Sequence, residues 1–403
     1  MSLCGGSPVA TQISDTPVSE AVPFFSQAES FDALWPLIEE RVNEVFEGGK
    51  FSHGPQVARW EKELVAYTGA RFAIGVNSGT DALVLLLRAC GLRRDEGVLV
   101  PVYSFVATAS SVVLAGGRPQ FVDIDPTTYA MDAAALESAV TPESRLVMPA
   151  HLFHQMADMR ALAAVAAGRG LTLVEDSAEA IGMRQDGRHA GLFGRGGVLS
   201  FFPSKTLGAL GDAGAVITDD EQVAQTVCAL RHHGRFGATL ADFPTISTET
   251  GVAGYNSKMD DIQAAVLSAK LTRLEQDIVR RAELAADYDR ALRDVPGIVR
   301  LPRTVERPGD ARGVFYVYLI EVEDRDRLVE HLERRGVGTE VYYPTPLHLQ
   351  PCFASLGHSR GDFPHAEAAS ERAVALPLYP DLKPDHMERV CAAVREFYTG
   401  RPE

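Results

Sequence analysis

The sequence predicts an α/β protein with a large domain, built on a mostly parallel sheet covered by helices, and a smaller C-terminal α+β domain. Between residue 72 and about residue 218, short and continuously apolar runs alternate with helical segments. Strands that are buried on both faces have this pattern, and strands that alternate with helices form parallel sheets. A chain of 403 residues also exceeds the size at which one hydrophobic core stops growing, so we expect two domains.

We expect three regions along the chain. Residues 1–22 are rich in Ser, Pro, Thr and Gly, lack the basic and apolar segments of a signal peptide, and predict a flexible N-terminal tail. Residues 23–289 are the expected large domain, which starts with a helical arm at 31–46 and 60–67 because apolar residues recur there at helical spacing. Residues 290–403 are the expected small domain.

The apolar pattern assigns the other elements in order. In the large domain we expect strands at 72–76, 97–101, 120–122, 146–149, 171–175, 198–202 and 215–218, and helices from residue 80, at 106–115 and at 157–167. One long helix, 259–287, leads to the small domain, with strands at 313–322 and 338–343 and helices at 324–335 and 384–398. Residues 234–251 predict a long surface loop, and such loops are often functional.

Composition excludes several classes of function. The formal net charge of −15, with scattered Lys and Arg residues, gives no basic footprint for nucleic acid. Five cysteines without metal-ligand spacing fit a reducing cytoplasm, and Cys90 in an apolar helical run predicts a buried small side chain. No segment approaches the ~18 to 20 apolar residues that a membrane span needs, so we expect a cytoplasmic protein without membrane contact.

The main chemical signal is one lysine in an apolar, glycine-rich turn. Lys205 lies in the run 199–208, and Asp176 follows the apolar run 171–174. We expect burial to disfavour the ammonium form of Lys205 and to free its amine for Schiff-base chemistry. An amine of this kind, together with a carboxylate that keeps a ring nitrogen protonated, is what pyridoxal 5'-phosphate (PLP) requires. The alternatives are a solvated loop lysine and an Asp that only caps a helix.

An anion site is expected at residues 77–80. Asn77-Ser78-Gly79-Thr80 lies between a strand and a helix, where free backbone N–H groups and the helix dipole favour a negative ligand. The alternative is an ordinary Ser/Thr N-cap. Since ligands of parallel sheets bind beyond the carboxyl ends of the strands, Gly79, Asp176 and Lys205 are expected at the same edge.

Eight short blocks occur in order along the chain: residues 77–83 (NSGTDAL), 104–109 (SFVATA), 121–125 (FVDID), 149–153 (PAHLF), the runs around Asp176 and Lys205, 256–260 (NSKMD) and 344–351 (PTPLHLQP). Taken together, they resemble the DegT/StrS family of sugar aminotransferases over nearly the whole chain. The resemblance implies the PLP-dependent transferase fold type I and a homodimer with shared active sites. It also implies that Gly79, Thr80 and Ser200 hold the cofactor phosphate, that Phe105 stacks on the ring, and that Asn256 reaches the phosphate of the neighbouring subunit.

Two positions depart from the family pattern. Glu179 stands where the family usually has Gln or His near the phenolic oxygen of the cofactor, so it is expected to be protonated, to face another cation, or to point away. Lys258 stands where Arg is frequent, which keeps the charge but loses the bidentate fork. By the same resemblance, Tyr343 and His348 face the substrate, as does Lys258. His151 and His154 lack a third ligand at recognisable spacing, so no metal is assigned.

The sequence therefore predicts a PLP-dependent aminotransferase in which Lys205 and Asp176 are catalytic. By family analogy, L-glutamate leaves its amino group on the cofactor, which cycles through pyridoxamine 5'-phosphate (PMP). The acceptor is a keto group of a nucleotide-linked, dTDP-type keto-deoxysugar, in amino-sugar biosynthesis for a natural product or a surface glycan. The 256–260 block leans toward 3-keto sugars. The alternatives are a PMP-dependent sugar dehydratase, a cyclitol aminotransferase and a non-catalytic PLP-binding regulator.

Overall fold

The computed structural model describes residues 21–235, 239–240, 243–247, 250–307 and 309–400, and two four-stranded sheets form its centre. The first sheet is entirely parallel and has the order β3 (Arg118–Val122), β2 (Gly97–Pro101), β4 (Ser144–Val147) and β5 (Thr172–Leu173). The second has the order β1 (Phe72–Val76), β10 (Gly214–Thr218), β9 (Gly197–Ser200) and β6 (Glu175–Asp176), with β10 antiparallel to both of its neighbours.

The two sheets are one continuous surface. Only Val174 separates β5 from β6, and Asp176 pairs in parallel with Ala150 beyond the end of β4. The Asp176 N–H donates to the Pro149 carbonyl at 3.0 Å, and the His151 N–H donates to the Asp176 carbonyl at 3.0 Å. The predicted mostly parallel sheet is therefore confirmed, with β10 as the antiparallel exception.

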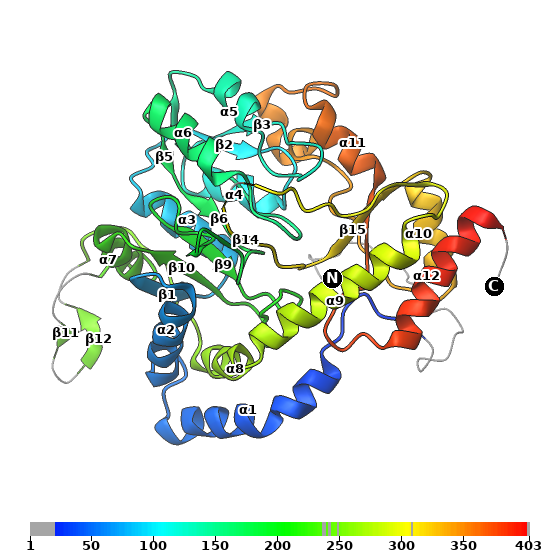
Figure 1. Ribbon diagram of the computed structural model, residues 1–403. Coiled ribbons are helices and arrows are strands. Elements are labelled where there is room, and N and C mark those ends of the chain that lie inside the picture. Colours follow the sequence, from blue (N-terminus) through cyan, green and yellow to red (C-terminus); the bar gives the residue numbers. More distant parts are fainter. Residues whose placement is uncertain (1–20, 236–238, 241–242, 248–249, 308, 401–403) are drawn as a thin grey trace, which may run out of the picture.

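Helices cover both faces of this sheet (Figure 1). Val98 and Val100 of β2 enter one apolar cluster, while Leu99 enters the other, so successive side chains of a fully buried strand serve opposite faces. One cluster includes side chains of α3 (Gly79–Ala89), α4 (Val106–Leu114) and α7 (Glu221–Leu230). The other includes side chains of α2 (Pro55–Thr68), α5 (Ala133–Ala139), α6 (Met159–Arg169) and α8 (Asp261–Leu271).

A third apolar cluster lies in the C-terminal part of the chain. It joins an antiparallel sheet to three helices: the sheet has the order β13 (Ile298–Arg300), β15 (Tyr318–Val322) and β16 (Ala373–Leu376), and the helices are α9 (Leu274–Leu292), α10 (Arg325–Arg334) and α12 (Pro384–Thr399). Between β15 and β16 lie α10, the 3₁₀ turns Leu347–Leu349 and Pro351–Leu356, and α11 (Pro364–Arg372). The boundary expected between residues 289 and 290 falls inside α9, which is continuous across it. The division into two domains at that point stays a prediction.

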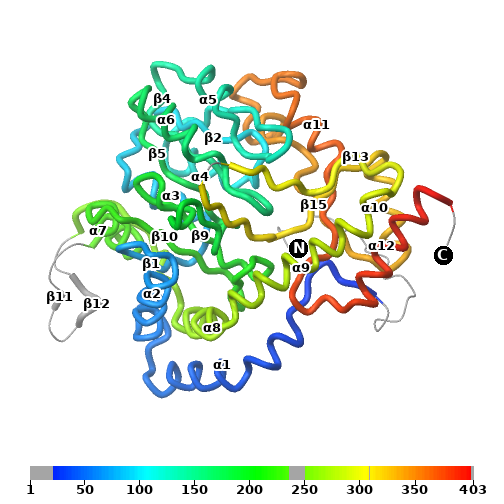
Figure 2. Tube along the Cα trace, in the orientation of Figure 1, coloured from blue at the N-terminus to red at the C-terminus, as the bar shows by residue number. Residues whose placement is uncertain are grey.

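The N-terminal arm connects the two parts. Helix α1 (Ala28–Gly48) runs along α8 (Figure 2). Leu34 and Ile38 of α1 pack against Val266 and Ala269 of α8. Val22, which the prediction placed in the tail, is buried and pairs with Val337 of the C-terminal part. The rest of the predicted tail, residues 1–20, lies outside the described residues.

The predicted helix 259–287 is wrong as a single element, because it is split into α8 and α9. At the break, the Thr272 side-chain hydroxyl donates to the Ala269 carbonyl at 2.6 Å, and the Thr272 and Arg273 N–H groups bond three residues back. A threonine hydroxyl that donates to a helical carbonyl competes with the backbone N–H for that acceptor, and this competition bends the helix. The break could not be predicted from the sequence pattern, because that pattern reports only the polarity of the side chains and not which backbone group a hydroxyl bonds.

Three further expectations need correction. Residues 338–343 form no ladder: Glu340 makes an isolated bridge with Ala375, the Gly338 N–H donates to the Val22 carbonyl at 2.8 Å, and Tyr342 and Tyr343 line a cavity instead of extending the sheet. The strand expected at 313–322 is restricted to β15. Within the loop expected at 234–251, the hairpin β11 (Thr239–Leu240) and β12 (Phe243–Ser247) stands apart from the rest of the chain in Figure 1.

A further small sheet has three strands, in the order β14 (Ala311–Arg312), β7 (Arg184–Gln185) and β8 (Arg188–His189). Within the described residues, none of the helices combines the length and the apolar composition that crossing a bilayer would require.

Candidate active site

A cavity of about 470 Å³ opens at the carboxyl edge of the main sheet. It collects side chains from the start of α3, the start of α4, the end of β6, the loop after β9 and the C-terminal part. Its lining includes eight of the side chains or backbone positions that the sequence singled out, namely Gly79, Thr80, Phe105, Asp176, Glu179, Ser200, Lys205 and Tyr343.

One end of the cavity is the N-terminus of α3. The Ser78 hydroxyl caps this helix by accepting the Asp81 N–H at 3.1 Å, so the N-cap alternative is confirmed, while the anion site stays a prediction. A Cβ atom on Gly79 would lie 2.8 Å from the Ser200 Cβ, so only glycine lets the helix start this close to the end of β9. First-turn amides lack helical acceptors, and Thr80 and Ser200 add hydroxyls beside them.

Asp176 closes the opposite wall as a buried carboxylate. Its Oδ2 atom accepts the Thr108 hydroxyl at 2.7 Å, and its Oδ1 atom accepts the Ala178 N–H at 3.2 Å. Since the Thr108 proton points to Asp176, the Ser104 hydroxyl, 2.7 Å from Thr108 Oγ1, is the donor in that pair. Burial raises the pKa of Asp176, while these hydrogen bonds oppose the rise, so the carboxylate benefits from a cationic partner in the cavity.

Lys205 corrects one expectation from the sequence. Burial is the largest single influence and lowers the pKa of its amine, as expected, but Glu179, Tyr316 and Asp176 together raise the pKa by more than burial lowers it. The pKa of Lys205 is therefore raised above its ordinary value rather than lowered. The reason is an ion pair in a shielded site, where Lys205 Nζ lies 3.0 Å from Glu179 Oε1.

Glu179 was expected to be protonated, to face a cation or to point away. The structure shows the second of these, and the cation is Lys205. Its second oxygen, Oε2, accepts the Phe153 N–H at 3.1 Å, and the Tyr343 hydroxyl lies 3.5 Å from Oε1. The carboxylate is 5% exposed. Both oxygens are held, so Glu179 is a fixed part of the wall.

The residues fit PLP. A phosphate suits the α3 N-terminus with Thr80 and Ser200, a protonated ring nitrogen suits the Asp176 carboxylate, and an aldehyde suits the Lys205 amine. Phe105 lines the same cavity with its ring 56% exposed and so offers an apolar face for stacking. Bound there, PLP supplies an aldehyde for amine exchange and a ring that accepts the electron pair released at carbon.

Three predicted site residues lie outside this cavity. Asn256 is exposed and accepts a hydrogen bond from Lys258 Nζ. The His348 ring is 2% exposed, with Nε2 3.0 Å from Glu367 Oε1 and the Phe363 ring 4.8 Å away. The Glu367 carboxylate and the Phe363 ring hold the His348 ring, and His348 does not line the cavity of its own chain. The roles of all three stay predictions.

Sequence reasoning missed four side chains of the cavity. Ser104 and Thr108 lie in a block that was recognised, and their spacing of four residues at a helix start was a usable signal for a shared contact. Tyr316 and Tyr342 come from the C-terminal part and are brought in by long-range packing. No local motif indicates them.

His151 and His154 are both engaged in contacts within the protein. His151 Nδ1 accepts the Ala157 N–H at 3.1 Å, so His151 Nε2 donates to Glu175 Oε2 at 3.0 Å. The His154 ring stacks on Phe315 with centroids 5.1 Å apart, and burial lowers the pKa of His154 to about 4. Within the part of the chain that the structure describes, no group of three or more His, Cys, Asp or Glu side chains could hold a metal ion.

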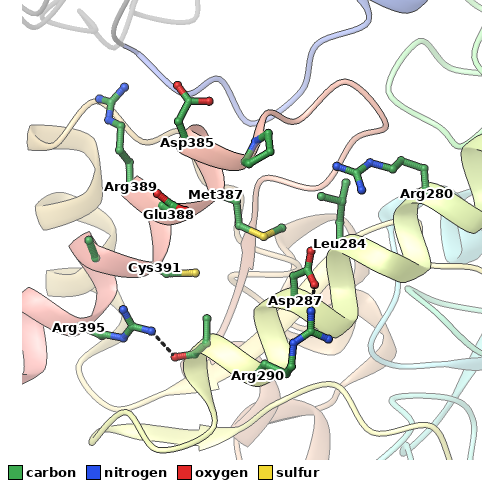
Figure 3. Close-up of a pocket in the computed structure, with 13 residues that line it drawn as sticks. Arg280, Leu284, Asp287, Arg290, Asp385, Met387, Glu388, Arg389, Cys391 and Arg395 are labelled. Atoms are coloured by element: carbon green, nitrogen blue, oxygen red, sulfur yellow. Dashed lines mark hydrogen bonds and ion pairs between the residues drawn. The ribbon is translucent and has the colours of Figure 1, made fainter.

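A larger groove, of about 780 Å³, lies between α9 and α12 (Figure 3). Two of its four arginines are engaged nearby: Arg290 pairs with Asp287, and Arg395 donates to the Ala291 carbonyl at 2.9 Å. None of the predicted site residues lines it. The smaller cavity is the candidate active site because it alone joins Lys205, Asp176 and a helix N-terminus.

The fold and this site define a PLP-dependent enzyme of the aminotransferase class. Residues 36–395 match the DegT/DnrJ/EryC1/StrS aminotransferase family, and the chain belongs to that family. The predicted family, fold class, aminotransferase activity and PLP cofactor are confirmed.

Three known proteins illustrate the range of relatives. The chain is 40% identical to the "Pleiotropic regulatory protein" of Geobacillus stearothermophilus, over 94% of this chain and 98% of that protein. It is 37% identical to the dTDP-3-amino-3,4,6-trideoxy-alpha-D-glucose transaminase of Micromonospora megalomicea subsp. nigra, over 90% of this chain and 95% of that enzyme. The structure of S. venezuelae DesV, in complex with a ketimine intermediate, is 35% identical, covers 94% of this chain and 99% of that one, and superposes with a TM-score of 0.88.

Proposed function

We propose that this chain transfers the amino group of an amino acid, L-glutamate by family analogy, to a keto group of a nucleotide-linked sugar of the dTDP-keto-deoxysugar class. The observation that carries the proposal is the single cavity in which Lys205, Asp176 and the α3 N-terminus meet. The name of the M. megalomicea relative supports the substrate class and agrees with the lean toward 3-keto sugars. Amino-sugar biosynthesis in the cytoplasm, for a natural product or a surface glycan, is part of the same proposal.

The residues divide the work of this reaction. Asp176 holds a proton on the ring nitrogen, and Thr108 and the Ala178 N–H hold the carboxylate in place. Lys205 would hold the cofactor through its aldehyde and, when its amine is free, would take up and return the proton of the substrate carbon. Glu179 lies within hydrogen-bond distance of Lys205 Nζ and is placed to exchange a proton with it.

The charge of the cavity supports a homodimer with shared sites. Among the described residues that line it, Lys205 is the sole lysine or arginine, against the carboxylates Asp176, Glu179 and Asp212. Both proposed substrates are anions, since one carries carboxylates and the other a diphosphate. A second copy, with Asn256 and Lys258 adjacent on an exposed surface, would supply the missing cation.

The mouth of the cavity supports the same assembly. Phe105 and Phe202 line the cavity and are 56% and 52% exposed. Large apolar side chains that stay this exposed at the rim of a site are typical of a surface that a partner covers. We infer that the second copy covers them.

Subunit exchange tests the shared site. Lys205→Ala removes the catalytic amine, and Asn256→Asp places a carboxylate beside the phosphate of the partner. If each variant is inactive as a homodimer, mixing them should restore up to one working site per dimer. Absence of recovery, despite exchange demonstrated with tagged subunits, would contradict the shared site.

A regulator that only binds the cofactor is the second candidate, because the G. stearothermophilus relative carries a regulatory name. Incubation of the PLP-loaded protein with L-glutamate distinguishes the two. An aminotransferase converts the bound cofactor to PMP, with loss of its long-wavelength absorbance, and then aminates a dTDP-3-keto-deoxysugar. A spectrum that no amino donor changes would favour the regulator. Turnover of a keto-cyclitol alone would favour a cyclitol aminotransferase, and loss of a sugar hydroxyl without amination would favour a sugar dehydratase.

A further inference from the structure

The free amine of Lys205 is held by two side chains from distant parts of the chain. Glu179 Oε1 lies 3.0 Å from Lys205 Nζ, and the centroid of the Tyr316 ring lies 4.3 Å from the same atom. An aromatic face at this distance attracts an ammonium ion through its quadrupole and has no comparable interaction with a neutral amine. Tyr316 is 5% exposed, so water weakens this attraction little.

One backbone residue fixes both partners of the lysine. The Phe153 N–H donates to Glu179 Oε2 at 3.1 Å, and the Phe153 carbonyl accepts the Tyr316 N–H at 2.7 Å. Phe153 has a φ of 67°, a left-handed conformation that costs a bulky residue energy. A strained conformation of this kind persists where several surrounding contacts hold it in place. Here those contacts are the two hydrogen bonds of the Phe153 backbone, and their partners, Glu179 and Tyr316, are the residues that hold Lys205.

Tyr316 is also fixed from its other side. The Arg281 guanidinium, on α9 and 1% exposed, donates through Nη1 to the Tyr316 carbonyl at 3.0 Å and to the Leu378 carbonyl at 2.8 Å. The Tyr316 hydroxyl lies 3.4 Å from the hydroxyl oxygens of Ser204 and Tyr342. The contacts of its backbone with Arg281 and Phe153 are the shorter ones and therefore fix the position of the ring.

We propose that Tyr316 is a positioning residue for Lys205: its ring binds the ammonium form of the free lysine beside Glu179 and thereby sets the protonation state of the lysine whenever it is not bound to the cofactor. We call Glu179, Tyr316 and the Phe153 backbone the lysine cradle. The lysine cradle explains why a lysine in an apolar turn keeps its proton. It also places Lys205 Nζ, which carries that proton, 3.0 Å from Glu179 Oε1, a carboxylate oxygen that can accept the proton when Lys205 must act as a base.

Other titratable groups face the same space. From all elements around the cavity these are Asp176, Glu179, Asp212, His151, Tyr316, Tyr342 and Tyr343. His151 is engaged by Glu175, and Asp176 contributes less than Glu179 to the raised pKa of Lys205. Burial raises the pKa values of Tyr342 and Tyr343, which keeps both hydroxyls neutral. Glu179 and the Tyr316 ring are thus the groups to vary.

The test measures the reactivity of Lys205 in the cofactor-free, full-length protein. Trinitrobenzenesulfonate reacts with the neutral amine, so the rate of labelling of the Lys205 peptide between about pH 6 and pH 11 reports its pKa. Tyr316→Phe keeps the ring face and should leave this profile unchanged. Tyr316→Leu removes the face and should speed labelling at neutral pH about tenfold, which corresponds to one pKa unit.

Two controls separate charge from access and from folding. Tyr342→Leu opens the same cavity but leaves the ring over Lys205, so its labelling rate should stay within about twofold of wild type. Phenylalanines with one, two and three fluorines at position 316 keep the shape while they weaken the ring face, and labelling should accelerate stepwise with fluorination. A flat fluorine series, or equal acceleration by Tyr342→Leu, would overturn the proposal.

The inference rests on Lys205 as the cofactor lysine, as in the proposed function. The labelling experiment uses no sugar, amino donor or partner exchange. A wrong sugar substrate would therefore leave its outcome intact, whereas a flat fluorine series would leave the aminotransferase assignment intact.

Discussion

Lys205 and Lys270 are two buried lysines at the loop that follows β9: Lys205 lies in this loop, and Lys270 binds its backbone. Their pKa values shift in opposite directions. Lys270, on α8 and 8% exposed, donates to the Gly208 carbonyl of that loop at 2.5 Å and to Gln27 Oε1 at 2.6 Å. Burial lowers the pKa of Lys270 to about 8, although the more distant Asp277 opposes this. The pKa of Lys205 is instead raised, because Glu179, with smaller contributions from Tyr316 and Asp176, reverses the effect of burial.

The difference shows what burial decides and what it does not. Both amines are desolvated, and desolvation favours the neutral amine in each. Neutral acceptors, such as the Gly208 carbonyl and the Gln27 amide, satisfy the hydrogen bonds of Lys270 without restoring its charge. A carboxylate at 3.0 Å reverses the direction for Lys205. The partner, more than the depth, sets the charge of a buried lysine.

The largest expected effect separates the two lysines by function. Lys205→Ala should lower kcat for transamination by about 10³-fold or more, because it removes both the group that binds the cofactor and the acid–base catalyst. Lys270→Met should keep kcat within about tenfold, since Lys270 supports the loop without touching the reacting atoms. Steady-state rates of glutamate-dependent amination measure both. Comparable losses in the two variants would remove the distinction.

Asp176→Asn should have the next largest effect. An amide cannot stabilise a protonated ring nitrogen, so kcat should fall by about 10²-fold or more while the fold is kept. Thr108→Val is the matched control, because it removes one hydrogen bond to Asp176 and leaves its charge; a smaller loss is expected. Rates are compared after correction for bound cofactor by absorbance. Near-normal turnover of fully loaded Asp176→Asn would refute the role.

Glu179→Gln should make Lys205 behave more like Lys270. Loss of the opposite charge removes the main group that favours the ammonium, so the pKa of Lys205 in the cofactor-free protein should fall by about one unit or more. The labelling profile of the Lys205 peptide measures the shift, and transamination should survive. Asp277→Asn, a carboxylate lost near Lys270, should leave that profile in place. An unchanged profile for Glu179→Gln would show that Glu179 is not the controlling partner.

The smallest effect concerns stability and follows from Lys270. Its pKa is about 8 in the folded protein, against an ordinary value of 10.5, so folding favours the neutral amine. Below about pH 8 the buried charge costs stability, and as the pH rises toward 10.5 the folded state loses its proton before the unfolded state does. Wild type should therefore gain up to about 3 kcal/mol over this range relative to Lys270→Met.

Urea unfolding at several pH values measures this gain as a difference between the two proteins. The difference cancels the titration of all groups that both proteins share. Parallel pH dependences would mean that Lys270 titrates normally in the folded state.

Much of the fold was predictable because it depends on local pattern. The strands around 72–76, 97–101 and 215–218 were predictable from continuous apolar runs, since strands buried on both faces have no polar side. The antiparallel direction of β10 was not, because its sequence is as apolar as that of its parallel neighbours. The break between α8 and α9 at Thr272 was also missed, since it depends on the hydrogen bond that the Thr272 hydroxyl donates to the Ala269 carbonyl.

The sequence by itself determined the chemistry of this protein: a lysine turn, a carboxylate at a strand end and a glycine at a helix start are motifs whose residues lie close along the chain or at the same sheet edge. Only the tertiary structure decided how that chemistry is tuned. Tyr316 reaches Lys205 through packing between distant segments, and the Phe153 backbone joins it to Glu179. The charge of Lys205 depends on which groups lie within a few ångströms of its amine, and no spacing along the chain specifies those distances.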